Sequence, residues 1–106
     1  MRVLLDECVP EGFRALLPDL RVVTAREAGL AGRKNGALLA AAEGRFDVLV
    51  TVDQSIPWQQ DVAAFELAVI VLRARSNSLL SLGPLVPDLL RTLSFIGPGQ
   101  VIRLGA

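Results

Sequence analysis

The sequence predicts an α/β protein: a three-layer sandwich in which helices cover both faces of a central, mostly parallel five-stranded sheet. Short apolar segments of about five residues alternate along the chain with segments of helical periodicity, the pattern of parallel strands joined by crossover helices. Several of these segments are apolar at successive positions, as in strands that are covered on both faces. The 106 residues suffice for one domain, so we expect a single domain over 1–106.

The first half of the chain supplies three of the expected strands. These strands are 2–5, 20–24 and 47–52. Pro10 suits the first turn of a helix that Pro18 ends. Asn35 is a good N-cap for the next helix, and Gly44 fits its C-terminal stop.

The second half of the chain supplies two more strands and the last helix. Residues 54–66 read as a loop with one short helix, and the strands are 67–72 and 100–104, the latter at an edge. Pro84 and Pro87 fit the helix at 84–95 only near its start, because an interior proline removes a hydrogen bond. Strand order does not follow from these patterns, although strands 2–5 and 67–72 are the least polar and are expected at the centre.

Composition excludes several classes of protein and site. The chain has no histidine, no tyrosine and one cysteine, which excludes Ser-His-Asp and Cys-His catalysis, histidine zinc sites and an internal disulfide. The glycine-rich phosphate loops are missing. The 11 basic and 11 acidic residues balance, so no global attraction to nucleic acid exists. No apolar stretch is long enough to span a bilayer and no signal-peptide layout is seen, so we expect a cytoplasmic protein without a membrane partner.

Carboxylates follow two of the expected strands. Asp6 and Glu7 come directly after an apolar run, and Asp53 ends a second one. Because carboxyl ends of parallel strands meet at one edge, where open α/β sheets bind ligands, we expect these three acids to converge as catalytic residues. Asp6 and Asp53 are the expected ligands of Mg²⁺ or Mn²⁺, whose chemistry suits phosphodiester hydrolysis. The alternative is that Asp6 and Asp53 simply cap the helices that follow, and Asp47 is expected at the opposite edge.

Four further residues are expected to bind substrate. Arg73 and Arg75 follow the fourth strand, and guanidinium groups grip phosphate through paired hydrogen bonds; alternatively, an arginine neutralises the acidic cluster. Trp58 is expected to stack on a base, or to cover an apolar edge. Asn35 completes the set. Cys8 is expected to be a packed thiol.

Two short motifs carry a resemblance to a known family. The segment 4–10, Leu-Leu-Asp-Glu-Cys-Val-Pro, and the segment 50–53, Val-Thr-Val-Asp, resemble the signatures of small prokaryotic PIN-like proteins. The resemblance implies a PIN-type fold with strand order 3-2-1-4-5. It also implies an Mg²⁺- or Mn²⁺-dependent ribonuclease acting on RNA, the toxin partner of an antitoxin, with Asp6 as the central metal ligand, Asp53 as a second and Glu7 adjacent.

One departure from the family leaves the activity open. Asn35 stands where PIN nucleases have another acid, and it offers a carbonyl oxygen without charge; Glu43 lies too far along the helix to replace it, and Glu27 or Asp61 are other candidates. The chain is therefore either a ribonuclease or a non-catalytic interaction module on a degenerate PIN-like scaffold. A phosphoacceptor domain is a third alternative, but it needs a lysine near the last strand, and the only lysine is Lys34. The apolar excess also predicts a homodimer.

Overall fold

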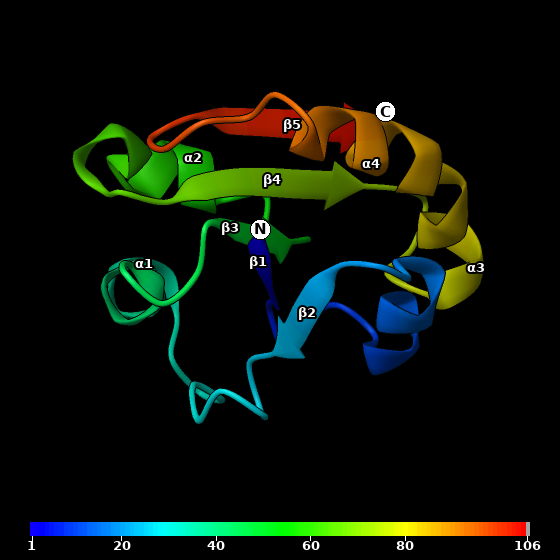
Figure 1. Ribbon diagram of the computed structural model, residues 1–106, viewed down its shortest axis with the longest axis horizontal. Coiled ribbons are helices and arrows are strands. Elements are labelled where there is room, and N and C mark those ends of the chain that lie inside the picture. The colour runs from blue at the N-terminus through cyan, green and yellow to red at the C-terminus, as the bar shows by residue number, and fades with distance from the viewer. Residues whose placement is uncertain (106) are drawn as a thin grey trace.

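The computed structural model describes residues 1–105 as an α/β fold built on a five-stranded parallel sheet (Figure 1). The strands are β1 (Arg2–Leu5), β2 (Arg21–Thr24), β3 (Val48–Thr51), β4 (Ala68–Arg73) and β5 (Val101–Gly105). The α-helices are α1 (Asn35–Ala42), α2 (Ile56–Gln59), α3 (Leu79–Leu82) and α4 (Val86–Leu93). Three 3₁₀ helices complete the fold: η1 (Glu11–Leu16), η2 (Val62–Ala64) and η3 (Gly83–Leu85). All five expected strands are therefore present, and no strand begins or ends more than one residue from its expected position.

The strands lie in the order β2-β1-β3-β4-β5, so the implied order 3-2-1-4-5 is wrong. That order would put the second strand between the first and the third, whereas β1 lies between β2 and β3. Burial explains the arrangement: Val3, Leu4 and Leu5 are 0 % exposed, while β2 begins with the exposed Arg21 and suits an edge. The central strand is β3, with β1 and β4 on either side of it, and β5 forms the other edge.

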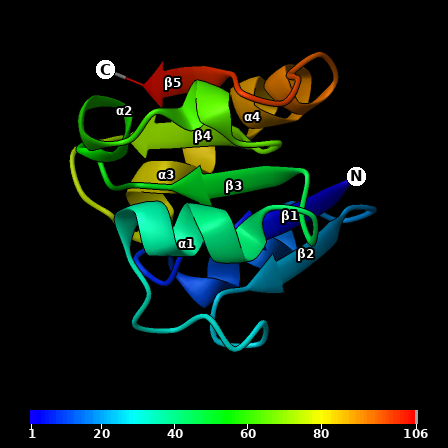
Figure 2. The same ribbon diagram turned by 90° about the vertical axis from the view of Figure 1, so that its left-hand side faces the viewer.

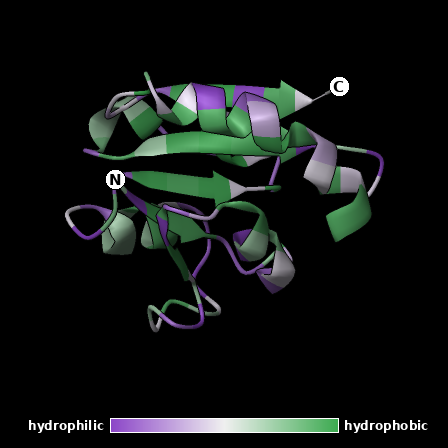
Figure 3. Cartoon of the chain, turned by 45° about the vertical axis from the view of Figure 1, so that its right-hand side comes forward, coloured by the Kyte–Doolittle hydropathy of each residue, from purple (hydrophilic) through white to green (hydrophobic). Residues whose placement is uncertain are grey.

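Two apolar clusters pack against opposite faces of the sheet, because successive side chains of a strand point to opposite sides. One cluster joins Val3 and Leu5 to side chains of η1, α3 and α4, and the other joins Leu4 to side chains of α1, α2 and η2. Figure 2 shows α1 and α2 on one side of the strands and α3 and α4 on the other. The central strands are hydrophobic along most of their length (Figure 3).

Helix starts and prolines agree only in part with the expectations. The helix expected after Pro10 is the 3₁₀ helix η1. Asn35 is not the N-cap of α1: Lys34 takes that place, and Asn35 starts the helix with φ 51°, a left-handed conformation that asparagine tolerates. The helix expected at 84–95 is α4, which follows the short elements α3 and η3. Pro84 and Pro87 stand in the first turns of η3 and α4, so the prediction that they fit only near a helix start is confirmed. Gly44 has φ 82° after α1, as a C-terminal glycine should.

The strand order creates a switch point between β1 and β3. The connection that leaves β1 packs on one face of the sheet through η1, and the connection that leads into β3 packs on the other through α1. Sheets with the order 2-1-3-4-5 bind ligands at the carboxyl ends of these two strands. Asp6 and Asp53 follow those ends. Within residues 1–105, no helix has the length and apolarity required to cross a membrane.

Candidate functional site

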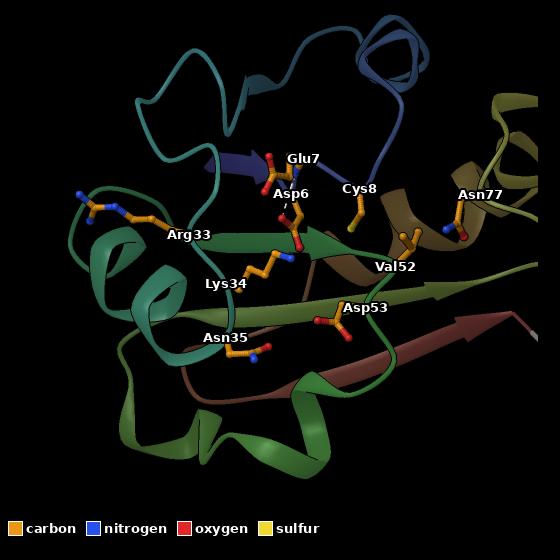
Figure 4. A pocket seen from close by; sticks show the side chains of 9 residues that line it. All are labelled: Asp6, Glu7, Cys8, Arg33, Lys34, Asn35, Val52, Asp53 and Asn77. Atoms are coloured by element: carbon orange, nitrogen blue, oxygen red, sulfur yellow. Dashed lines mark hydrogen bonds between the residues drawn. The ribbon is translucent and has the colours of Figure 1, made fainter.

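A cavity of about 280 Å³ opens at the carboxyl ends of β1 and β3 (Figure 4). Its lining comes from the loops after β1, β3 and β4 and from the start of α1. The lining residues are Asp6, Glu7, Cys8, Arg33, Lys34, Asn35, Val52, Asp53 and Asn77. The fold thus brings four of the expected site residues, Asp6, Glu7, Asp53 and Asn35, to the wall of one cavity.

Asp6 is held in a fixed orientation at the floor of this cavity. It is only 8 % exposed, and its N–H donates to the carbonyl oxygen of Val50 at 3.0 Å, which extends the pairing of β1 with β3. Its Oδ1 accepts the N–H of Glu7 at 2.8 Å, and its Oδ2 accepts the hydroxyl of Thr51 at 2.7 Å. The alternative that Asp6 caps the first helix is wrong, because Pro10 takes that position and no side chain caps η1.

Asp53 combines a structural contact with a free oxygen. Its Oδ1 accepts the N–H of Ser55 at 2.9 Å and the hydroxyl of Ser55 at 2.6 Å, so it does stabilise the turn into α2. Among residues 1–105, no hydrogen bond reaches its other carboxylate oxygen. The alternative that Asp53 caps α2 is wrong, because Ser55 is the N-cap and it has no side-chain cap hydrogen bond; the contact with Ser55 leaves one carboxylate oxygen of Asp53 available to a ligand.

Thr51 links the two carboxylate-bearing residues. It is 0 % exposed; its hydroxyl donates to Asp6 and accepts the N–H of Asp53 at 3.0 Å. Because its one hydroxyl hydrogen is committed to Asp6, the thiol of Cys8, with Sγ 3.5 Å from the hydroxyl oxygen, is the donor in that contact. Desolvation of the sulfur raises the pKa of the Cys8 thiol, but the residue as a whole is exposed at the cavity wall, so the expectation of a packed thiol is wrong.

The sequence patterns assign no role to Thr51, although this residue is part of the Val-Thr-Val-Asp motif. The sequence feature that points to Thr51 is its position: it is a polar residue at the end of an otherwise apolar strand.

The expected convergence of three acids is not formed. Glu7 turns toward the loop before α1, where its Oε1 accepts the N–H of Gly32 at 3.0 Å. In the part of the chain that the structure describes, no group of three or more acidic, cysteine or histidine side chains is placed to hold one metal ion. The carboxylates of Asp6 and Asp53 and the amide of Asn35 remain as oxygen donors on the cavity wall.

A lysine enters the same cavity. Figure 4 shows the side chain of Lys34 extending toward the space between Asp6 and Asp53, while Arg33 points away from the cavity centre. The four ion pairs among residues 1–105 lie elsewhere and join Arg2 to Asp47, Arg14 to Glu27, Arg26 to Glu11 and Arg91 to Asp88. Lys34 therefore adds a positive charge near the two carboxylates without closing a salt bridge to either.

Three of the expected substrate-binding residues lie outside this cavity. Arg73 and Arg75 line a separate hollow of about 360 Å³ beside the exposed Leu80. Neither arginine pairs with the acids of the cavity, so the expected neutralisation by arginine is absent among residues 1–105. Trp58 projects from α2 and is 81 % exposed, and Arg103 of β5 places its guanidinium carbon 5.1 Å from the ring centroid.

The remaining candidate acids have structural partners elsewhere. Asp47 lies at the opposite edge, as expected; it accepts the N–H of Arg2 at 2.6 Å, and this contact, with the Arg2 guanidinium, lowers the pKa of Asp47. Glu27 binds Arg14 and the N–H of Thr24. The carboxylate of Glu43 accepts the N–H of Glu66. None of these acids, nor Asp61, lines the cavity.

Comparison with known proteins adds no assignment to this geometry. No family model, curated protein or solved structure matches the chain. The resemblance to PIN-like proteins therefore remains a prediction that depends on the two short motifs.

Proposed function

We propose that the protein is an Mg²⁺- or Mn²⁺-dependent ribonuclease with a three-layer, PIN-like fold, and the toxin component of a toxin–antitoxin pair. The observation that carries the proposal is the placement of Asp6 and Asp53 at the adjoining ends of β1 and β3. Carboxylate and amide oxygens are the ligands these ions prefer, and Mg²⁺ commonly uses one or two carboxylates together with water. Asp6 and Asp53, with the amide of Asn35, fit that requirement.

The residues that line the cavity would have two roles, metal binding and RNA binding. A bound ion would supply a polarised phosphate and an activated water for hydrolysis. Asp6 and Asp53 would hold it, and Thr51 keeps Asp6 oriented through the 2.7 Å hydrogen bond. The ammonium of Lys34 would bind a phosphate oxygen of the RNA, and Asn77 would donate a hydrogen bond to the same strand.

The test is cleavage of single-stranded RNA in Mn²⁺, together with Mn²⁺ titration by calorimetry. We expect Asp6→Asn and Asp53→Asn each to lower cleavage by at least about 100-fold, since even residues that only support metal ligands cost 10–100-fold when changed. Asp61→Asn is the matched control, because Asp61 is an exposed carboxylate outside the cavity. Cleavage that survives both site substitutions would refute the proposal.

A non-catalytic interaction module is the alternative. Two observations favour it: within residues 1–105 no third acid is placed to share a metal ion with Asp6 and Asp53, and Lys34 extends toward these carboxylates. In that case the Lys34 ammonium is the permanent counter-ion of the two carboxylates. Lys34→Gln separates the two functions. In a nuclease it weakens RNA cleavage and leaves Mn²⁺ affinity unchanged; in the module it creates Mn²⁺ binding that the unmodified protein lacks.

A phosphoacceptor role for Asp53 draws support from the strand order and from Lys34 on the same cavity wall. We rank it below the other two functions, because β5 ends in Leu104 and Gly105 without a lysine. Incorporation of beryllofluoride at Asp53 would favour it, and failure to bind beryllofluoride or to react with acetyl phosphate would remove it.

The partners form a separate part of the proposal. We expect a cytoplasmic protein that forms a homodimer, since Leu80 is 89 % and Phe95 63 % exposed. A monomeric mass by light scattering at micromolar concentration would contradict the dimer. A small protein encoded beside this gene that blocks RNA cleavage would support the toxin role, and its absence would leave a nuclease without an antitoxin.

A further inference from the structure

Trp58 is a large aromatic side chain that is mostly exposed to solvent. It is the only tryptophan of the chain and is 81 % exposed. Its packing partner is Arg103, whose guanidinium lies over the ring at 5.1 Å, within the range of a cation–π contact. The guanidinium restrains the indole and leaves most of the ring surface facing solvent.

The element that carries Trp58 is anchored to both the core and the cavity. Ile56, two positions earlier, is 0 % exposed and packs with α1 and β3 side chains. Ser55 is tied to Asp53 by two hydrogen bonds. Only five peptide units separate Trp58 from Asp53, which bounds the distance between their Cα atoms at about 18 Å. In Figure 4, α2 and β5 lie on the Asp53 side of the cavity.

We propose that Trp58, backed by Arg103, is a stacking platform for one base of a single-stranded RNA whose phosphate enters the Asp6–Asp53 cavity. This inference depends on the proposed action on RNA and names a contact for it outside the cavity. A flat indole with a guanidinium behind it matches the face of a nucleobase, and every base has such a face. The positive charge of Arg103 also attracts the adjacent phosphate.

The surroundings of Trp58 favour a base over an apolar protein surface. The ring is followed in the chain by Gln59 and Gln60, and its partner is a charged residue. A protein-docking patch needs contiguous apolar area, whereas the residue that packs on this ring is charged. We therefore expect the protein to bind single-stranded RNA of any base sequence, because stacking does not depend on the hydrogen-bonding groups of a base.

The single tryptophan supplies a direct assay. Its fluorescence is followed while the protein is titrated with an oligouridylate in EDTA, so that no hydrolysis occurs, and again in Ca²⁺. A ribose-phosphate oligomer of equal length without bases is the matched ligand control. We expect saturable quenching by the oligouridylate and none by the abasic oligomer, since only a stacked base touches the ring.

Variants then measure the contact with a labelled oligonucleotide by anisotropy. Trp58→Ala should weaken binding by roughly 5- to 150-fold, Trp58→Phe by less, and Arg103→Gln by an intermediate factor. Phe95→Ala is the control, an exposed aromatic outside α2, and should change affinity less than twofold.

Absence of quenching, or Trp58→Ala binding within twofold of the unmodified protein, would overturn the platform. If RNA is nevertheless cleaved in Mn²⁺, the nuclease proposal stands without it. Quenching and loss of affinity in Trp58→Ala with no cleavage in any divalent ion would support the platform and refute the nuclease.

Discussion

Replacement of Thr51 by valine tests the hydrogen bonds that organise the cavity. Valine has nearly the volume of threonine, so it removes the hydroxyl without opening a space. The change deletes the 2.7 Å bond to Asp6, which is 8 % exposed, and the 3.0 Å bond from the N–H of Asp53. A hydrogen bond to a charged group contributes about 1.5–3 kcal/mol, and an unsatisfied buried group costs about 1–3 kcal/mol. We therefore expect the free energy of unfolding to fall by about 2–4 kcal/mol.

Thr51→Ser is the matched control, because it keeps the hydroxyl and loses one buried methyl group, at a cost of about 1 kcal/mol. Both variants are measured by urea unfolding followed by far-UV circular dichroism at neutral pH, where an unchanged m-value means that only stability has changed. A loss below about 1 kcal/mol in the valine variant, or a serine variant that loses as much as the valine variant, would show that the hydroxyl does not organise these carboxylates.

Three further predictions concern other parts of the fold. Gly105→Ala should destabilise the protein by at least about 1 kcal/mol more than Gly44→Ala in urea unfolding: both glycines have positive φ, but a Cβ at Gly105 would lie 1.8 Å from a carbonyl oxygen of β4, whereas nothing lies within 4 Å at Gly44; equal losses would contradict this. The N–H of Thr24 is the main cause that lowers the pKa of Glu27 below its ordinary 4.5, so its stabilisation is present above pH 4.5 and is lost as the pH falls through the folded pKa; unfolding measured against pH should show Glu27→Gln less stable at neutral pH and the difference closing in acid, and a constant difference would refute the linkage. Because desolvation of the sulfur raises the pKa of Cys8 above its ordinary 9.0, the pH midpoint of its alkylation by iodoacetamide should exceed that of a cysteine peptide, and a lower midpoint would contradict this desolvation.

Much of the fold can be read from local patterns. β1 was predicted at its observed ends, and the other strands to within about one residue, because buried parallel strands are short, continuous apolar runs between breaks. The two carboxylates at the ends of β1 and β3 follow from the same patterns, since a residue after a parallel strand must lie at its carboxyl edge. Helix starts are less predictable: Lys34 is the N-cap of α1, and Asn35 is its first residue with φ 51°, a left-handed conformation that asparagine tolerates.

The sequence alone therefore determined which residues form strands and which edge of the sheet bears Asp6 and Asp53. Only the tertiary structure decided the lateral order of the strands and the direction of each side chain. Burial of β1 on both faces displaced β2 to the edge, and that order made β1 and β3 neighbours. The same packing brought Lys34 into the cavity, turned Glu7 to Gly32 and left Arg73 and Arg75 at another hollow. These contacts join residues far apart in the chain, and no local periodicity encodes them.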